Sequence, residues 1–277
     1  MSSATGRFTV LHISDVHATE EGLLYGTVDG VGRLERVGEY ARSVGMTPEA
    51  VVITGDLAQR GHPGAYPAVA RACDRLAEIV GAPVFTVLGN HDDPAAATVL
   101  PRHRHGHVGV EHVEGYRIVR LDSSTGSLGT EQLTWLAETL REPSESGSIV
   151  ALHHAPVESP LPSLSTQGLA DARELLSVLE GSDTRAILAG HFHHSLTASL
   201  GGIPVFVGPS LAYHQVMDAG PDTVAGHDAP MFSLVQFTAL GVSAAAIGLQ
   251  SPPPIFSRPL THRAVPLEKP EKADHVP

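Results

Sequence analysis

Five short apolar stretches, each followed at once by residue types that ligate metals, constrain this chain most strongly. The stretches are VLHIS, VVIT, VFTVL, IVAL and AILA, and their continuous apolar character is typical of buried strands in a parallel sheet. Residues just past such strands converge at one sheet edge, where α/β proteins place their sites. The motifs after the stretches are Asp15-Val16-His17, Gly55-Asp56, Gly89-Asn90-His91-Asp92, His153-His154 and Gly190-His191-Phe192-His193.

The first third of the chain alternates strands with helices. The pattern predicts strands over 8–14, 50–54 and 83–88, separated by helices over 31–44 and 65–80. This order favours parallel strands with right-handed crossovers.

The remainder predicts a second sheet. Segments 108–113 and 115–122 indicate an antiparallel pair, and strands are expected over 148–152 and 185–189. From 196 to 248 the signal is all strand, with strands expected over 196–200, 203–207, 231–237 and 241–247. A helix over 131–140 has Thr130 as its expected N-cap. Another is expected to open with the capping box Asp171-x-x-Glu174 and to stop at Gly181.

These elements predict an α/β protein, a four-layer α-β-β-α sandwich of two mixed sheets. We expect this domain to span residues 1–249. Residues 250–277 hold seven prolines and predict an extended or disordered tail that forms no domain.

Composition excludes several classes of function. A formal charge of −12 opposes nucleic-acid binding, which needs clustered Lys and Arg. The chain has no apolar run of about 18 residues or more and no signal-peptide pattern, so we expect no membrane association. Cys73 is the single cysteine, which fits a reducing cytoplasm.

The donor types at the strand ends predict a two-metal site. Carboxylate, imidazole and amide ligands suit two divalent ions, and paired metals are common in phosphate-ester cleavage. Asp15 and His17 would face the same way if the strand pleat continued past them, and an extended segment would align His191 and His193 likewise. Asp56, at a neighbouring strand end, could bridge both ions. Mixed N/O ligation leaves Mn, Fe and Zn open.

Each motif alone also has an ordinary structural explanation. Asp-x-His arises often by chance, Gly-Asp is common turn chemistry, and Asn90 could form an Asx turn or a helix cap. One buried and one exposed imidazole would equally explain His153-His154. Five ligand-bearing motifs at five strand ends are a rare coincidence, and the joint pattern favours the metal site.

In this order the motifs resemble those of the calcineurin-like metallophosphoesterases, and among them the class III bacterial cyclic nucleotide phosphodiesterases. The family pattern D-x-H, GD, GNH, H and GHxH is matched by DVH, GDL, GNHDD, LHHAP and GHFH, and the likeness spans about residues 8–215. The resemblance implies hydrolysis of a small-molecule phosphodiester by a metal-bridging hydroxide, with cyclic nucleotides favoured, and a homodimer. A phosphomonoesterase, a hydrolase of other diesters such as glycerophosphodiesters, and a non-catalytic scaffold stay open.

The resemblance also implies a role for each motif residue. Asp15, His17 and His193 would hold one metal, and Asn90, His153 and His191 would hold the other, with Asp56 bridging both. His153 is preferred to His154 because it directly follows the apolar run. His91 would be the catalytic residue that contacts phosphate, and Asn90 would share in substrate binding.

Other polar residues receive weaker assignments. Tyr25, Arg60 and His214 are candidates for the substrate mouth, although a surface role explains Arg60 more simply. Gln59 stands where protein phosphatases of this superfamily carry the Asp that orients the histidine, so which carboxylate orients His91 is open.

Histidines outside the motifs have structural explanations. His12 lies inside the first strand and is expected to be a satisfied core residue. The PRHRHGH segment, which contains three histidines, is expected to be a solvated loop.

Overall fold

The first sheet is built around the three strands that the apolar pattern predicts. In a computed structural model that describes residues 6–250 and 252–258, β1 (Phe8–Ile13), β2 (Ala50–Thr54) and β3 (Val84–Val87) are parallel. Antiparallel strands β12 (Met231–Thr238) and β13 (Gly241–Gly248) extend it to the order β13-β12-β1-β2-β3. The C-terminal strands therefore return to complete the N-terminal sheet.

The second sheet has the strand order β4-β5-β6-β7-β9-β8. Its members are β4 (Gly109–Val113), β5 (Tyr116–Arg120), β6 (Gly147–Ala151), β7 (Thr184–Ala189), β8 (Leu196–Leu200) and β9 (Ile203–Val207). The inner strands pair in parallel, and β4 and β8 pair antiparallel at the two edges. A separate two-stranded ribbon joins β10 (His214–Gln215) to β11 (Gly226–His227).

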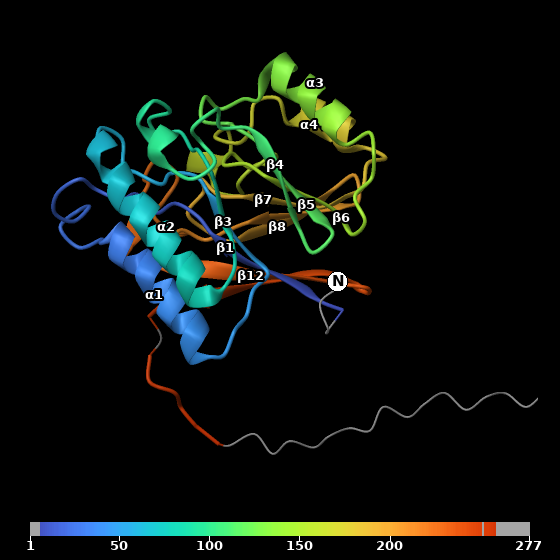
Figure 1. Ribbon diagram of the computed structural model, residues 1–277. Helices are drawn as coiled ribbons and strands as arrows, with labels where there is room; N and C mark the ends of the chain where they lie inside the picture. The colour runs from blue at the N-terminus through green and yellow to red at the C-terminus, as the bar shows by residue number, and fades with distance from the viewer. Residues whose placement is uncertain (1–5, 251, 259–277) are drawn as a thin grey trace, which may run out of the picture.

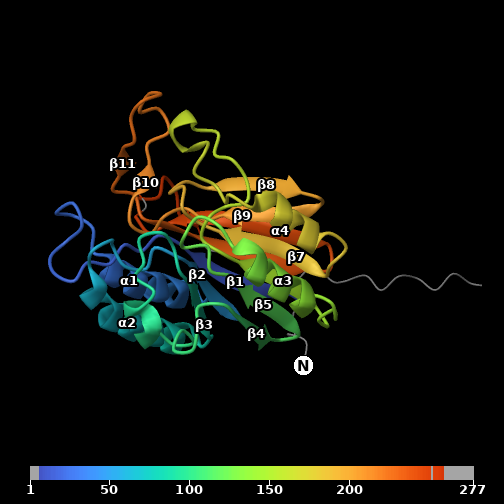
Figure 2. The same ribbon diagram turned by 90° about the horizontal axis from the view of Figure 1, so that it is seen from above.

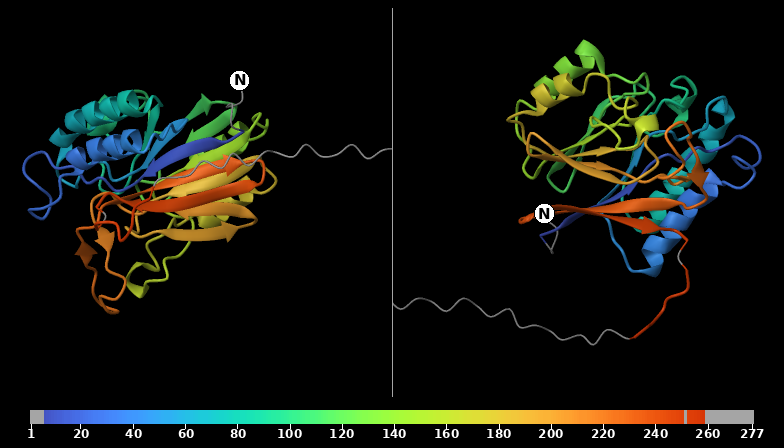
Figure 3. Two further views of the ribbon diagram at one scale, coloured as in Figure 1. Left: turned by 90° about the horizontal axis from the view of Figure 1, so that it is seen from below. Right: turned by 180° about the vertical axis from the view of Figure 1, so that it is seen from behind.

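Helices cover the outer face of each sheet (Figures 1 and 3). The first sheet packs on α1 (Gly30–Ser43) and α2 (Tyr66–Val80), and the second packs on α3 (Gly129–Thr139) and α4 (Ala172–Leu179). Short 3-10 turns occupy Pro63–Ala65, Ala96–Val99 and Pro162–Leu164. The predicted α/β class and four-layer sandwich of two mixed sheets are confirmed.

Three apolar layers hold the sandwich together because successive side chains of each strand point to opposite faces. In β1, Leu11 packs toward the helices while Val10 packs between the sheets. In β6, Val150 faces the helices and Ile149 faces the opposite sheet. Every one of these side chains is fully buried, which explains why the strands lack polar alternation.

The C-terminal tail lies largely outside the described residues. Residues 252–258 form no helix or strand. Among the described helices, none is both long and apolar enough to span a bilayer.

Asp171 occupies the predicted N-cap position of α4, and this helix ends just before Gly181 as expected. The predicted side-chain caps are wrong, because Thr130 lies inside α3 and Asp171 makes no side-chain hydrogen bond to its own helix α4. The Asp171 carboxylate instead accepts hydrogen bonds from the backbone N–H of Leu128 at 2.9 Å and of Gly129 at 2.8 Å. Asp171 therefore caps the neighbouring helix in space, a partner that local sequence spacing does not show.

We expect Asp171→Ala to lower the free energy of unfolding by about 1–2 kcal/mol, because it leaves the first N–H groups of α3 without an acceptor. Thr130→Ala, at the position that the sequence favoured, should change it by less than about 0.5 kcal/mol. Denaturant unfolding of the two variants measures the difference. Equal losses would show that Asp171 is not the cap.

Three histidines outside the motifs, His12, His103 and His194, are buried. His12 Nε2 lies 2.9 Å from Thr54 Oγ1, but its Nδ1 has no partner among the described residues, so the prediction of a satisfied core histidine is only half right. His103 was expected in a solvated loop and is fully buried instead. Its Nε2 lies 2.8 Å from Thr86 Oγ1 and its Nδ1 lies 3.0 Å from Nδ1 of His107.

His103 should make stability depend on pH. Burial, aided by the nearby Arg120 charge, lowers the pKa of His103 from 6.5 to about 4. Unfolding then takes up a proton between these values, so the contribution of neutral His103 is full above pH 6.5 and is lost as pH falls toward 4.

We therefore expect His103→Gln to flatten the dependence of unfolding free energy on pH in this window, by up to about 1.4 kcal/mol per pH unit. Urea unfolding at several pH values measures the slope, and His105→Gln, an exposed neighbour, is the control. Identical slopes for the His103 variant and the parent chain would contradict this account.

Candidate metal centre

The seven predicted ligand residues lie together at one edge of the sandwich. They sit on the loops that follow β1, β2, β3, β6 and β7, so that each sheet contributes part of the set. The residues are Asp15, His17, Asp56 and Asn90 from the first sheet and His153, His191 and His193 from the second. All but Asn90 and His191 are fully or almost fully buried, and those two are half-buried.

One group of donors consists of Asp15, His17, Asp56 and His193, whose ligand atoms all lie within 4.8 Å of one another. The Nε2 atoms of His17 and His193 are 3.1 Å apart. His193 Nε2 is 3.4 Å from Asp15 Oδ1, and His17 Nε2 is 3.5 Å from Asp56 Oδ2. Two imidazoles and two carboxylates thus face a common point.

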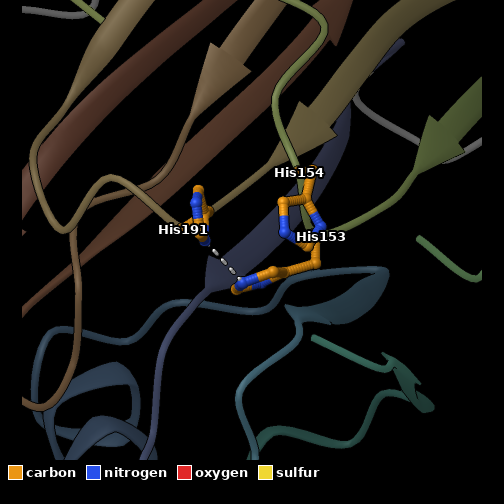
Figure 4. A group of neighbouring side chains, drawn as sticks. All are labelled: His153, His154 and His191. Carbon is orange, nitrogen blue, oxygen red and sulfur yellow. Dashed lines mark hydrogen bonds between the residues drawn. The ribbon is translucent and has the colours of Figure 1, made fainter. Parts of the chain in front are cut away.

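The second group centres on His153. Its Nε2 lies 3.1 Å from Asn90 Oδ1 and 3.2 Å from Nδ1 of His191 (Figure 4). The same Nε2 is 3.5 Å from Asp56 Oδ2, the atom that also faces His17. Asp56 therefore stands between the two groups, where a bridging carboxylate would have to lie.

His154 also lies close to His191, with ring centroids 4.4 Å apart, and its donor atoms could join that group. Its Nδ1 however lies 3.3 Å from Ser123 Oγ, whereas His153 points its Nε2 at Asn90 and Asp56. The geometry thus supports the choice of His153, which stays a prediction.

The backbone delivers these side chains by left-handed turns. Asp15, His17, Asp56, His191 and His193 have φ of 54°, 48°, 49°, 77° and 56°. The expectation that a continuing strand pleat aligns the i, i+2 pairs is wrong, because β1 ends at Ile13 and both pairs follow in turns. Non-glycine residues rarely adopt such values, and strained positions of this kind concentrate at functional sites.

Hydrogen bonds fix which nitrogen of three histidines faces the centre. His153 Nδ1 donates to Thr54 O at 2.8 Å, and His193 Nδ1 donates to Tyr213 O at 3.1 Å. His17 Nδ1 lies 2.8 Å from Gln59 Oε1. Each outer nitrogen therefore carries the proton, and each inner Nε2 presents a lone pair, as metal-ligating histidines do.

These lone pairs fit metal ions. Facing lone pairs of His17 and His193 repel one another unless a cation lies between them. Two nitrogens bound at about 2.1 Å and at right angles would be about 3.0 Å apart, close to the separations seen in both groups. The donor set, nitrogen with carboxylate and amide oxygen, suits Mn, Fe or Zn without selecting one.

Electrostatics keep the carboxylates of the centre ionised and two of its imidazoles neutral, whereas at His153 burial is outweighed by the Asp56 and Asp15 charges, which raise its pKa. Burial lowers the pKa of His17 to about 4 and of His191 to about 3, so both nitrogens are free to bind at neutral pH. Burial opposes ionisation of Asp15 and Asp56, but the surrounding histidines hold both pKa values below the ordinary range. Buried carboxylates of this kind are stabilised by a cation.

His91 lies beside the centre, and its ring contacts His17 with centroids 4.8 Å apart. Its Nδ1 lies 3.2 Å from Gln59 Oε1, the oxygen that also orients His17. The group beside His91 Nδ1 is therefore the amide oxygen of Gln59, whereas a carboxylate was expected from the sequence to orient this histidine. Burial lowers the pKa of His91, so its Nε2 is an unprotonated acceptor before an anion approaches.

Asp92 locks two of the ligand-bearing loops together. Its buried carboxylate accepts hydrogen bonds from the backbone N–H of Leu57 at 3.1 Å, of Ala58 at 3.0 Å and of Gly89 at 2.8 Å. Tyr66 donates its hydroxyl to the same group at 2.8 Å. The loops after β2 and β3 are thereby held in one arrangement.

The three weaker candidates for substrate contact, Arg60, His214 and Tyr25, lie outside the two donor groups. Arg60 is exposed and donates to the backbone oxygen of Asn90 at 3.0 Å. His214 is half-buried in β10, where its Nδ1 donates to Gln215 O at 2.9 Å. Tyr25 contacts Tyr213, with ring centroids 5.7 Å apart.

Sequence reasoning missed two residues that touch the predicted ligands. Tyr213 packs its ring on His193 at a centroid distance of 4.2 Å, and no pattern in the sequence marks it. Ser123 Oγ accepts from the backbone N–H of His153 and His154, at 3.2 Å and 3.0 Å.

Comparison with known proteins agrees with this geometry. Residues 8–195 match the family model described as calcineurin-like phosphoesterase. A cAMP/cGMP dual specificity phosphodiesterase of Mycobacterium tuberculosis is 39% identical over 236 residues, which cover 80% of this chain and 73% of that protein. A probable cyclic nucleotide phosphodiesterase of Rhodococcus erythropolis is 37% identical over 228 residues, 79% of this chain and 76% of that protein.

Among solved structures, a dimetal phosphatase from Danio rerio aligns with a TM-score of 0.53 at 16% identity, over 88% of this chain and 99% of that chain. This likeness shows the fold. The match over residues 8–195 shows the family, and the chain belongs to the calcineurin-like phosphoesterases.

Metal content should separate the bridging position from the phosphate-contacting one. We expect Asp56→Asn to bind less than half of the metal that the parent chain retains after dialysis, because Asp56 faces both donor groups. His91→Ala should retain the parent content, because its ring stands outside those groups. Asp122→Asn, a carboxylate that also follows a strand, is the control. Full metal retention by Asp56→Asn would reject the bridge.

Proposed function

We propose that this protein is a dinuclear metal-dependent phosphodiesterase that hydrolyses cyclic nucleotides. The observation that carries the proposal is the convergence of histidine nitrogens and two carboxylates on adjacent points that share Asp56. The names of the two relatives, both cyclic nucleotide phosphodiesterases, favour this substrate class over other esters.

In this proposal Asp15, His17 and His193 hold one ion and Asn90, His153 and His191 hold the other, with Asp56 in common. Bound divalent ions would supply Lewis acidity at the phosphate and a water made acidic enough to attack. The chain provides a rigid donor set and, with Asp15 and Asp56, the negative charge that retains cations. No side chain is needed as a nucleophile.

His91 supports the loss of the leaving group. An approaching phosphate anion favours the protonated imidazole, because opposite charge raises a histidine pKa. Protonated His91 can then donate from Nε2 to a phosphate or ester oxygen while Gln59 holds Nδ1. Attack would form one P–O bond to the water oxygen, whose proton passes to solvent, and would break the P–O bond to the leaving ester oxygen, which takes its proton from His91.

The proposal also covers the identity of the metals, the cellular location and the oligomeric state. Mn, Fe or Zn would occupy the site, and the catalyst would be a cytoplasmic homodimer whose substrate is a small molecule. The cytoplasmic setting rests on the single Cys73, and the homodimer rests on the family resemblance alone.

A substrate panel tests the proposal. We expect the metal-loaded protein to hydrolyse cyclic AMP and bis(p-nitrophenyl) phosphate faster than p-nitrophenyl phosphate, as kcat/KM measured with each added metal. His91→Ala should lose about 10²- to 10⁴-fold in kcat while it retains metal. His105→Ala, at an exposed loop position, is the control. Preference for the monoester by a large factor would overturn the proposal in favour of a phosphomonoesterase.

A further inference from the structure

Exposed apolar side chains gather on two loops beside the metal centre. Tyr25, on the loop between β1 and α1, is 72% exposed, and Met217 and Val224, between β10 and β11, are 47% and 60% exposed. Figure 2 shows both loops, in blue and orange, on the same side of the molecule. Exposed apolar side chains that cluster together indicate a binding surface more often than single exposed apolar side chains do.

A cavity of about 510 Å³ lies between these loops. Its apolar wall consists of Tyr25, Val28, Tyr213 and Val224, and Thr27 and Asp228 supply polar groups. We call it the two-tyrosine cavity. Its size falls within the range of small-molecule sites, about 300–1,000 Å³.

The two-tyrosine cavity shares a wall with the metal centre. The Tyr213 ring packs on His193 at a centroid distance of 4.2 Å and lies parallel to His17 at 6.0 Å. Tyr25 meets the same ring edge-on at 5.7 Å. The predicted metal ligands do not line the cavity, so a molecule whose phosphate reaches them has to pass the Tyr213 ring to place its remaining part against Tyr25.

The walls of this cavity are fixed rather than loose. Arg33 of α1 is buried and donates to the backbone oxygen of Ala212 and to Asp228, which ties the Tyr213 side of the cavity to this helix. Gly226 leaves no room for a β-carbon against the Tyr213 ring. Tyr25 itself has φ of 53°, a strained value for a bulky residue, and strain of this kind is typical of functional positions.

We propose that the two-tyrosine cavity binds the aromatic base of the substrate, with the base stacked on Tyr25. This inference rests on the proposed diesterase function and adds a binding site for the group that the metals do not contact. Aromatic rings provide a face for any flat base, and Thr27 and Asp228 can hydrogen bond its edge. Binding there holds the phosphate over the metal centre and so raises kcat/KM for base-bearing esters.

The test compares substrates with and without a base. Cyclic AMP is paired with a ribose 3′,5′-cyclic phosphate in which a methoxy group replaces adenine. Tyr25→Ala should reduce kcat/KM for cyclic AMP by about 5- to 150-fold, the range for loss of one base–aromatic stack. The same variant should change kcat/KM for the base-free ester by less than twofold.

Two variants act as matched controls. Tyr25→Phe keeps the ring and should retain most of the preference for cyclic AMP. Leu23→Ala removes an exposed apolar side chain from the same loop that does not line the cavity, and should change neither substrate. Thermal unfolding and metal content of each variant confirm that the fold and the centre are intact.

The outcomes separate this inference from the proposed function. Equal losses on both cyclic esters, or no loss on either, would overturn the base site while cyclic nucleotide hydrolysis stands. If the parent chain hydrolyses neither cyclic ester, the proposed substrate class fails. Bis(p-nitrophenyl) phosphate and methyl p-nitrophenyl phosphate, which share a leaving group, then decide the aromatic site. A selective loss of the bis-aryl ester in Tyr25→Ala supports it, and equal losses reject it.

Discussion

Contact between the two sheets at one edge is the constraint on which the rest of this structure depends. His153, from the second sheet, donates its Nδ1–H to the carbonyl of Thr54 at the end of β2, and the His191 N–H donates to the Asp15 carboxylate at 3.1 Å. Gly190 permits this approach, because a β-carbon there would overlap Ser14 Oγ. Donors from both halves of the chain therefore meet before any ion binds.

This contact has a cost in stability. Asp15 and Asp56 bring two buried negative charges within reach of the same histidines, and five left-handed residues surround them. Buried charge without compensation is unfavourable, so bound cations would stabilise the folded state as well as supply chemistry. The Asp92 network, which fixes the loops after β2 and β3, limits the relaxation that would otherwise scatter the donors.

The sequence located the strands and the ligand-bearing loops well, since both depend on local pattern. Apolar runs identify buried strands, and position after a strand end identifies Asp15, Asp56 and Asn90. The predictions that were wrong concern residues whose partners lie far away in the sequence. Asp171 caps a helix 42 residues earlier, and no spacing rule reveals that choice. The left-handed residues His17 and His193 likewise have distant backbone partners, since the His17 N–H donates to Asp56 O and the His193 oxygen accepts from the Gln215 N–H.

Selectivity in such a protein has to arise away from the metal donors. The donors meet the phosphate, which every phosphoester shares, so they cannot by themselves distinguish one ester from another. The loop after β1 carries Asp15 and His17 themselves, and the segment after β9 contacts the donors through Ser210, Ala212, Tyr213 and Gln215. The exposed apolar groups lie farther along both segments. Arg33 of α1 anchors the segment after β9 through Ala212 and Asp228. A rigid core that holds the donor set, with exposed side chains on the neighbouring loops, lets the loop surface vary without disturbing the donors.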